Sequence, residues 1–162
     1  IAMSLVLEPG RLQIKDQFHL NAAVALTCYE FFSGYAGEET KIKWPNDLFW
    51  RDRKAGGVLI ESKYQGKTWK WAVVGIGINI NQTKFDKFLV NPVSLKQITG
   101  KTFNTIDLAK EVRNGSFLTI LRSIALGVIN NKGFQTDIIT ALYPRQAINL
   151  VAKSIFPGCI FR

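Results

Sequence analysis

Two apolar runs that each carry a pair of glycines place the strongest constraint on how this chain can fold. The first is Gly56-Gly57-Val58-Leu59-Ile60, and the second is Val73-Val74-Gly75-Ile76-Gly77-Ile78. Both runs are typical of strands, and a glycine weakens a strand unless a ligand or another backbone has to approach closely. Two such strands side by side would form a floor without side chains. The alternative is that the glycines mark β-bulges or tight packing under a helix, and both interpretations stay open at this point.

Polar residues stand at or beside the ends of these runs. Pro45 cannot donate to a sheet ladder, so the strand before it should stop there and leave Asn46 and Asp47 at its carboxyl end. Lys54 stands at the entry to the first glycine run, and Asn79 follows the second. Together they offer a cation for a phosphate or carboxylate, a carboxylate for a hard metal ion, and amides that orient both. The sequence therefore predicts a ligand site at these strand ends.

Length and composition indicate one domain. The chain has 162 residues, and an apolar content of 47% is enough for one real core but not for two of ordinary size. The net charge of +9 favours anionic partners without choosing among them. Cys28 and Cys159 lie far apart and outside any Cys-x-x-Cys pair, so neither a disulfide framework nor a zinc site is indicated. The first residues do not show a basic n-region followed by an apolar h-region, no apolar run is long enough to span a membrane, and we expect a soluble, cytoplasmic protein.

The order of predicted elements indicates an antiparallel meander with helices on one face. We expect a buried-type strand at residues 3–7, a helix from Asp16 to about Phe32, and strands at residues 40–44, 48–50, 58–62 and 68–80. A short helical turn should follow at residues 94–98, then a helix capped by Thr105 or Asp107, and a further helix at residues 134–143. The residues expected on the core face of the first long helix are Phe18, Ala22, Ala25, Tyr29 and Phe32.

Three blocks of this sequence resemble the catalytic domain of biotin protein ligases. They are Lys43-Trp44-Pro45-Asn46-Asp47, then Lys54 with the strand Gly56-Gly57-Val58-Leu59-Ile60-Glu61, then Gly75-Ile76-Gly77-Ile78-Asn79. The blocks occur in the order and at the spacing of that family, and the resemblance extends over roughly residues 1 to 143. It implies an α+β fold: a mixed, largely antiparallel sheet with helices packed on one face, similar to class II synthetases and to the biotin and lipoate ligase catalytic domain.

The resemblance also implies a reaction in two steps. ATP activates biotin as biotinyl-5'-AMP, and a lysine of a biotin carboxyl carrier protein domain, as in the acetyl-CoA carboxylase subunit, then takes the biotin. Lys54 would be the catalytic lysine, serving the biotin carboxylate and the phosphate in turn. By the family pattern, the slot for biotin would be formed by Lys54, Gly56, Gly57, Leu59, Gly75, Gly77 and Ile78. The matching positions for ATP are Lys43, Trp44, Asn46, Asp47 and Asn79, with Asp47 and Asn79 near Mg²⁺.

Two departures from the family leave alternatives open. The family carries a Gly- and Arg-rich biotin loop upstream of the strand that Ala2 to Leu7 resembles, so we interpret residues 1–146 as an N-terminally incomplete catalytic domain. Residues 147–162 would be the start of a small C-terminal β domain. The alternatives are a lipoate protein ligase-like enzyme, or an inactive ligase core that serves as a binding or dimerisation module. We expect neither a nucleic acid nor a membrane as partner, and a homodimer is left open.

Overall fold

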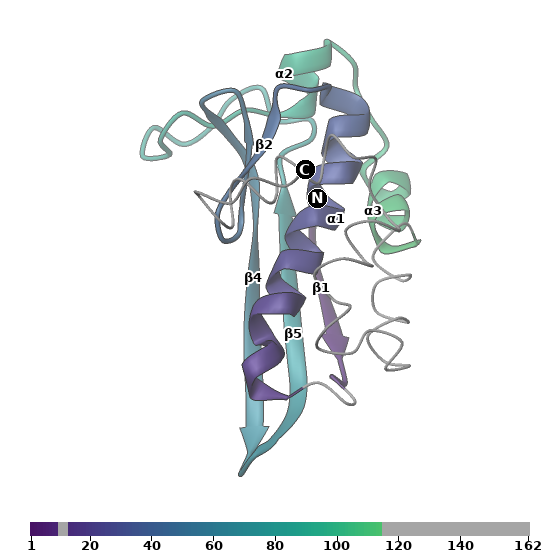
Figure 1. Ribbon diagram of the computed structural model, residues 1–162. Helices are drawn as coiled ribbons and strands as arrows, with labels where there is room; N and C mark the ends of the chain where they lie inside the picture. Colours follow the sequence, from purple (N-terminus) through teal and green to yellow (C-terminus); the bar gives the residue numbers. More distant parts are fainter. Residues whose placement is uncertain (10–12, 115–162) are drawn as a thin grey trace, which may run out of the picture.

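The computed structural model describes residues 1–9 and 13–114, which form a five-stranded antiparallel sheet with helices on one face (Figure 1). The strands are β1 (Ala2–Leu7), β2 (Thr40–Lys43), β3 (Asp47–Trp50), β4 (Arg53–Gln65) and β5 (Thr68–Ile78). The helices are a 3-10 turn (Ile14–Asp16), α1 (Gln17–Ala36), α2 (Leu95–Thr99) and α3 (Thr105–Asn114). The predicted α+β class and its meander are confirmed. The helix expected at residues 134–143 and the domain boundary at residue 147 lie outside the described residues.

The strand order β1-β5-β4-β3-β2 combines local and distant pairing. Strands β2 to β5 follow one another as neighbours, whereas β1, the first described strand, pairs with β5, the last described one. We expected the first strand to be of the buried type, and this is wrong. β1 is an edge strand whose residues alternate between exposed and partly buried positions. A short apolar run does not reveal which strand will become an edge, because that depends on pairing with a distant segment.

Alternation along the strands gives the sheet one buried face and one open face. The side chains that β5 directs at the helices are almost completely buried and lie in the core: Ala72, Val74, Ile76 and Ile78. Figure 1 shows α1 running along this face of β4 and β5. Ala2 and Ser4 of β1 point the other way and are exposed, as is Leu59 of β4. No described helix covers this second face.

Helix α1 is buried on more than one side, which corrects the narrow face expected from the sequence. Every residue from Ala22 to Cys28 is buried, so the middle of the helix is enclosed. Phe18 is 45% exposed, whereas Leu20 and Val24 lie in the core. The helix also continues past Phe32, through Gly34 to Ala36, because an exposed glycine is tolerated inside a helix that tertiary contacts stabilise.

The ends of the helices depend on specific residues. Gly37 terminates α1: it has a left-handed φ of 80°, and its N–H donates to the carbonyl of Ser33 at 2.8 Å. At α2, Ser94 and Gln97 form a reciprocal capping box. Asn104, rather than the expected Thr105 or Asp107, caps α3, because its Oδ1 accepts the N–H of Ile106 at 3.0 Å.

Cys28 is a free thiol in the core under the sheet. Burial raises the pKa of this thiol to about 12, so it stays protonated at neutral pH. Cys159 lies outside the described residues. Among the helices of the described ranges, none has the length and apolar character that crossing a membrane requires.

The neighbouring strand leaves no room for a side chain at Gly56. Gly56→Ala is therefore expected to destabilise the fold by about 1–3 kcal/mol or more. A Cβ at this position would be closer to the backbone carbonyl oxygen of Gly77 than real Cβ atoms come, and a backbone atom within a sheet cannot move aside cheaply. Urea unfolding measures the change. Gly34→Ala is the control, because a Cβ there meets nothing within 4 Å and alanine favours the helix. An equal free energy of unfolding for the two variants would contradict the prediction.

Candidate functional site

A row of residues that runs across four strands forms the centre of the open face. The strand register places Ala2 opposite Gly77, Gly77 opposite Gly57, and Gly57 opposite Asp47. Directly paired residues direct their side chains to the same face of a sheet. The two glycines in the middle therefore leave a strip of bare backbone, with Asp47 at one end. The predicted floor without side chains is confirmed for this pair of strands.

The bare strip is the base of a shallow depression. In the next row across the sheet, Gly75 lies between Ser4 of β1 and Leu59 of β4. The depression has a volume of about 540 Å³, within the usual range of roughly 300–1,000 Å³ for small-molecule sites. Its lining residues are Ala2, Met3, Ser4, Asn46, Asp47, Lys54, Gly57, Val58, Leu59, Gly75, Ile76 and Gly77.

Lys54 and Asp47 form an ion pair beside the bare strip. Lys54 Nζ is 2.6 Å from Asp47 Oδ1, and both side chains remain partly exposed. Asp47 is also the cross-strand partner of Lys43, so the two side chains leave the same face of the sheet. A Cβ on Gly57 would lie 3.0 Å from Asp47 Oδ1, which shows how closely the carboxylate approaches the strip. The site thus places one anion and one cation next to a surface that a flat ligand can contact.

A β-bulge directs Lys54 onto the open face. Strict alternation from Gly57 would turn residue 54 toward the helices. The register shifts here: Leu48 pairs with Gly56, but Phe49 pairs with Lys54, so Ala55 is the extra residue. Ala55 is fully buried, and Lys54 emerges beside Asp47.

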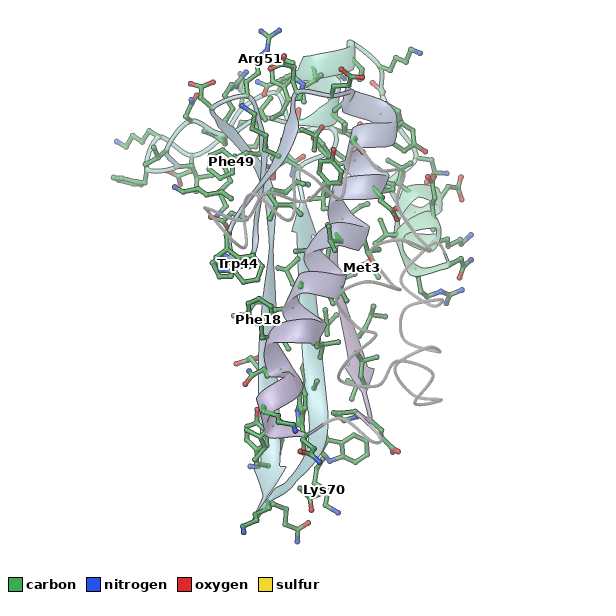
Figure 2. The ribbon with its side chains drawn as sticks, viewed as in Figure 1. Met3, Phe18, Trp44, Phe49, Arg51 and Lys70 are labelled. Atoms are coloured by element: carbon green, nitrogen blue, oxygen red, sulfur yellow. The ribbon has the colours of Figure 1, made fainter. Side chains whose placement is uncertain are left out.

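The expected ATP residues Lys43 and Trp44 lie at the β2 side of the site. Lys43 Nζ lies 5.3 Å from the centroid of the Phe49 ring, a cation–π contact. Trp44 is 38% exposed and packs against Phe18 of α1, with ring centroids 5.0 Å apart (Figure 2). Trp44 does not line the depression, whereas Lys43 lies next to Asp47.

Asn46 and Asn79 are both held against β4. The amide of Asn46 donates to the carbonyl of Val58 at 2.8 Å, and the N–H of Val58 donates back to the carbonyl of Asn46 at 2.8 Å. The N–H of Asn79 donates to the carbonyl of Ala55 at 2.8 Å, and its side-chain amide lies 3.5 Å from the carbonyl of Lys54. Each side chain keeps a carbonyl oxygen that can accept a hydrogen bond or contact a cation.

The structure does not bring every expected slot residue to this face. Ile78 is 2% exposed and points into the core, and Gly56 is buried on the side of the helices. Both are neighbours of floor glycines, and alternation turns neighbours to opposite faces. Ala2 and Ser4 line the depression but were not expected in the site. The alternation of Ala2 and Ser4 with Met3 and Leu5 could have placed them on one face of β1. It does not indicate which strand lies next to β1.

The described residues contain no group of three or more His, Cys, Asp or Glu side chains that could hold a metal ion. The expected Mg²⁺ position at Asp47 and Asn79 therefore offers one carboxylate and one amide. Mg²⁺ commonly uses one or two carboxylates together with waters and substrate phosphates, so these residues fit an ion that arrives with a nucleotide.

These features define an α+β domain whose open sheet face carries a depression of a size usual for small-molecule sites, with a glycine floor and a lysine–carboxylate pair at its edge. Residues 1–79 match the model of the biotin/lipoate A/B protein ligase family. It is 40% identical over 85 residues to the bifunctional ligase/repressor BirA of Bacillus subtilis, which covers 52% of this chain and 26% of that protein. It is 34% identical over 83 residues to biotin–protein ligase 2 of Arabidopsis thaliana, which covers 49% of this chain and 25% of that protein.

Solved structures of biotin protein ligases are similar to this chain as well. The apo structure of biotin protein ligase from Aquifex aeolicus superposes with a TM-score of 0.66 at 25% identity, covering 85% of this chain and 58% of that chain. The same enzyme in complex with biotin and ATP gives a TM-score of 0.64 at 25% identity, covering 77% of this chain and 51% of that chain. The chain thus spans about a quarter of the length of the curated relatives and a little over half of these solved chains.

Proposed function

We propose that this chain is the substrate-activating core of a biotin protein ligase, which makes biotinyl-5'-AMP from biotin and ATP. It then transfers biotin to a lysine of a biotin carboxyl carrier protein domain, such as that of an acetyl-CoA carboxylase subunit. The relatives with this name and the biotin and ATP complex of the Aquifex protein support the proposal. The observation that carries it is the position of Lys54, with its ion pair to Asp47, beside the bare strip of Gly57 and Gly77.

The floor suits the flat, largely apolar body of biotin. Gly57, Gly75 and Gly77 let the ligand approach the backbone of two strands, and Leu59 provides an apolar side chain that is 63% exposed. Close contact with such a surface excludes water from the ligand, and an acyl-adenylate needs this because water hydrolyses it. Gly56 and Ile78 would support this floor from below rather than touch biotin.

Lys54 would act at the reacting carboxylate. In the first step a biotin carboxylate oxygen attacks the α-phosphorus of ATP, and the bond from that phosphorus to the pyrophosphate oxygen breaks. Two anions have to meet, and the ammonium of Lys54 can form charge-assisted hydrogen bonds to both. In the second step the carrier lysine, as a neutral amine, attacks the biotin carbonyl carbon, AMP leaves, and the amine loses a proton.

The nucleotide would extend from Lys54 toward β2. Lys43 would bind phosphate, and the carbonyl oxygens of Asn46 and Asn79 would orient the ligand, while Trp44 would act only through packing. Asp47 and Asn79 would hold Mg²⁺, which would neutralise phosphate charge when bound. Asp47 Oδ1 meanwhile keeps Lys54 in place.

Isothermal titration calorimetry with biotin and with lipoate, each with and without ATP, tests the proposal. A biotin ligase should bind biotin, release pyrophosphate when ATP is added, and bind lipoate more weakly. The reverse preference would favour a lipoate ligase. Binding of neither acid by the folded chain would contradict the proposal and favour a non-enzymatic binding or dimerisation module.

A further inference from the structure

The backbone of Lys54 is held by a segment far along the chain. Its N–H donates to the carbonyl of Asn91 at 2.9 Å, and its carbonyl accepts the N–H of Val93 at 2.9 Å. These two bonds form an isolated parallel bridge between Lys54 and Pro92. Backbone N–H and C=O groups of folded proteins are nearly always hydrogen-bonded. Both groups of Lys54 are bonded to the same segment, residues 91–93.

The local strand geometry explains why this segment is needed. The β4–β5 register ends at Gly56 and Ile78, so β5 does not extend far enough to pair with Lys54. On the other side, the bulge at Ala55 interrupts the ladder to β3. Residues 91–93 occupy the side of β4 that β5 leaves. They therefore set the position from which the Lys54 side chain reaches Asp47.

Asn91 fixes this segment. It is one of two non-glycine residues with positive φ among the described residues, with a φ of 47°, a conformation that asparagine tolerates better than most residues. Its side-chain amide donates to the Asp52 carboxylate at 3.0 Å and lies 3.3 Å from the Asp52 carbonyl. Asp52 precedes β4 by one residue, so this contact ties the segment to the turn that leads into Lys54.

Arg53 provides a second tie. Its guanidinium donates to the carbonyl of Pro92 at 2.6 Å, and it also lies 3.4 Å from Oε1 of Gln97 in α2. Because Gln97 belongs to the capping box of α2, the segment is anchored to a helix as well as to the β3–β4 turn.

We propose that Asn91 is a positioning residue for Lys54: through its left-handed backbone and its contact with Asp52, it sets where the ammonium lies relative to Asp47. The consequence for catalysis rests on the proposed function, but the positional effect does not. Asn91 does not itself line the depression, and it acts through its hydrogen bond to the backbone of Lys54, which does.

The isosteric change Asn91→Asp tests the proposal. It keeps the size and the tolerance of positive φ, but it replaces an amide donor by a carboxylate facing Asp52. The first readout is acylation of Lys54 by an amine-reactive ester, measured by mass spectrometry against exposed Lys63 of the same strand. We expect the ratio to rise by about two- to fivefold, the range for loss of a partly exposed ion pair. The second readout is biotin-dependent pyrophosphate exchange, whose kcat/KM should fall about tenfold or more.

Two further variants make the test specific. In the double variant Asn91→Asp with Asp52→Asn, the amide at position 52 can donate a hydrogen bond to the carboxylate at position 91. Both readouts should therefore return toward the wild-type values. Asp86→Asn is the matched control, since the Asp86 carboxylate accepts only the N–H of Phe88 in the same loop among the described contacts. It should change neither readout.

The outcomes separate the two proposals. An unchanged acylation ratio in folded Asn91→Asp, or equal changes in Asp86→Asn, would overturn the positioning role. A shifted ratio without any exchange activity in the wild-type chain would keep the positioning role and count against the ligase function.

Discussion

Lys54→Ala is expected to abolish biotin-dependent pyrophosphate release while the fold stays intact. The side chain is partly exposed and pairs only with Asp47 among the described contacts, so its removal takes away little packing. It also removes the cation at which the biotin carboxylate and the α-phosphate would meet. Loss of such a charge-assisted contact in the transition state costs about 10²–10³ in rate, and more when two anions depend on it. Pyrophosphate release and thermal unfolding, measured on the same preparation, give the two values.

Lys63→Ala is the control for this prediction. Lys63 is exposed and lies on the same strand, but it does not line the depression. Its substitution should leave pyrophosphate release close to the wild-type rate. If Lys54→Ala retained the activity of Lys63→Ala, Lys54 would have no role in activating biotin.

Gly77→Val is expected to block biotin without destabilising the sheet. A Cβ at Gly77 would meet only the Gly57 carbonyl oxygen, at 3.9 Å, which is an ordinary contact. Valine also favours strands over glycine, so stability should stay the same or rise by up to about 1 kcal/mol. The added methyl groups would stand on the bare strip where biotin has to lie. We expect calorimetry to show biotin affinity reduced by about a hundredfold, which corresponds to roughly 2.7 kcal/mol.

Thr68→Val provides the matched control at the opposite end of β5, away from the depression. It should leave biotin affinity unchanged. Normal affinity in a folded Gly77→Val protein would mean that the strip is not the biotin surface. Gly56→Ala differs from both, because there the neighbouring backbone, and not a ligand, leaves no room for a side chain.

Local patterns predicted the elements that depend on local chemistry. Pro45 correctly predicted the end of β2, and the composition around Gly66 correctly predicted the β4–β5 turn, where Gly66 has a φ of 57°. The motif residues Asn46, Asp47, Lys54, Gly57 and Gly77 do meet at one site. Their roles toward biotin and ATP remain predictions.

The features that were missed depend on non-local pairing. Which strand lies next to β5, and hence that Ala2 and Ser4 border the glycine strip, follows from pairing between two segments that are far apart in sequence. The face of Gly56 and Ile78 depends on the register and on the bulge at Ala55. A motif places all its residues near a site, but only the register decides which of them touch the ligand.

The pairing of β1 with β5 has a consequence for synthesis on the ribosome. Ala2 and its partner Gly77 are 75 residues apart in sequence (77 minus 2). At about 5–20 residues per second, β1 is synthesised roughly 4 to 15 seconds before its partner. Throughout that interval one wall of the depression is a lone strand without hydrogen-bonding neighbours from the sheet. We therefore expect the nascent chain to form its ligand site only after translation has passed Ile78. Until then, we expect chaperones to bind the unpaired strand β1.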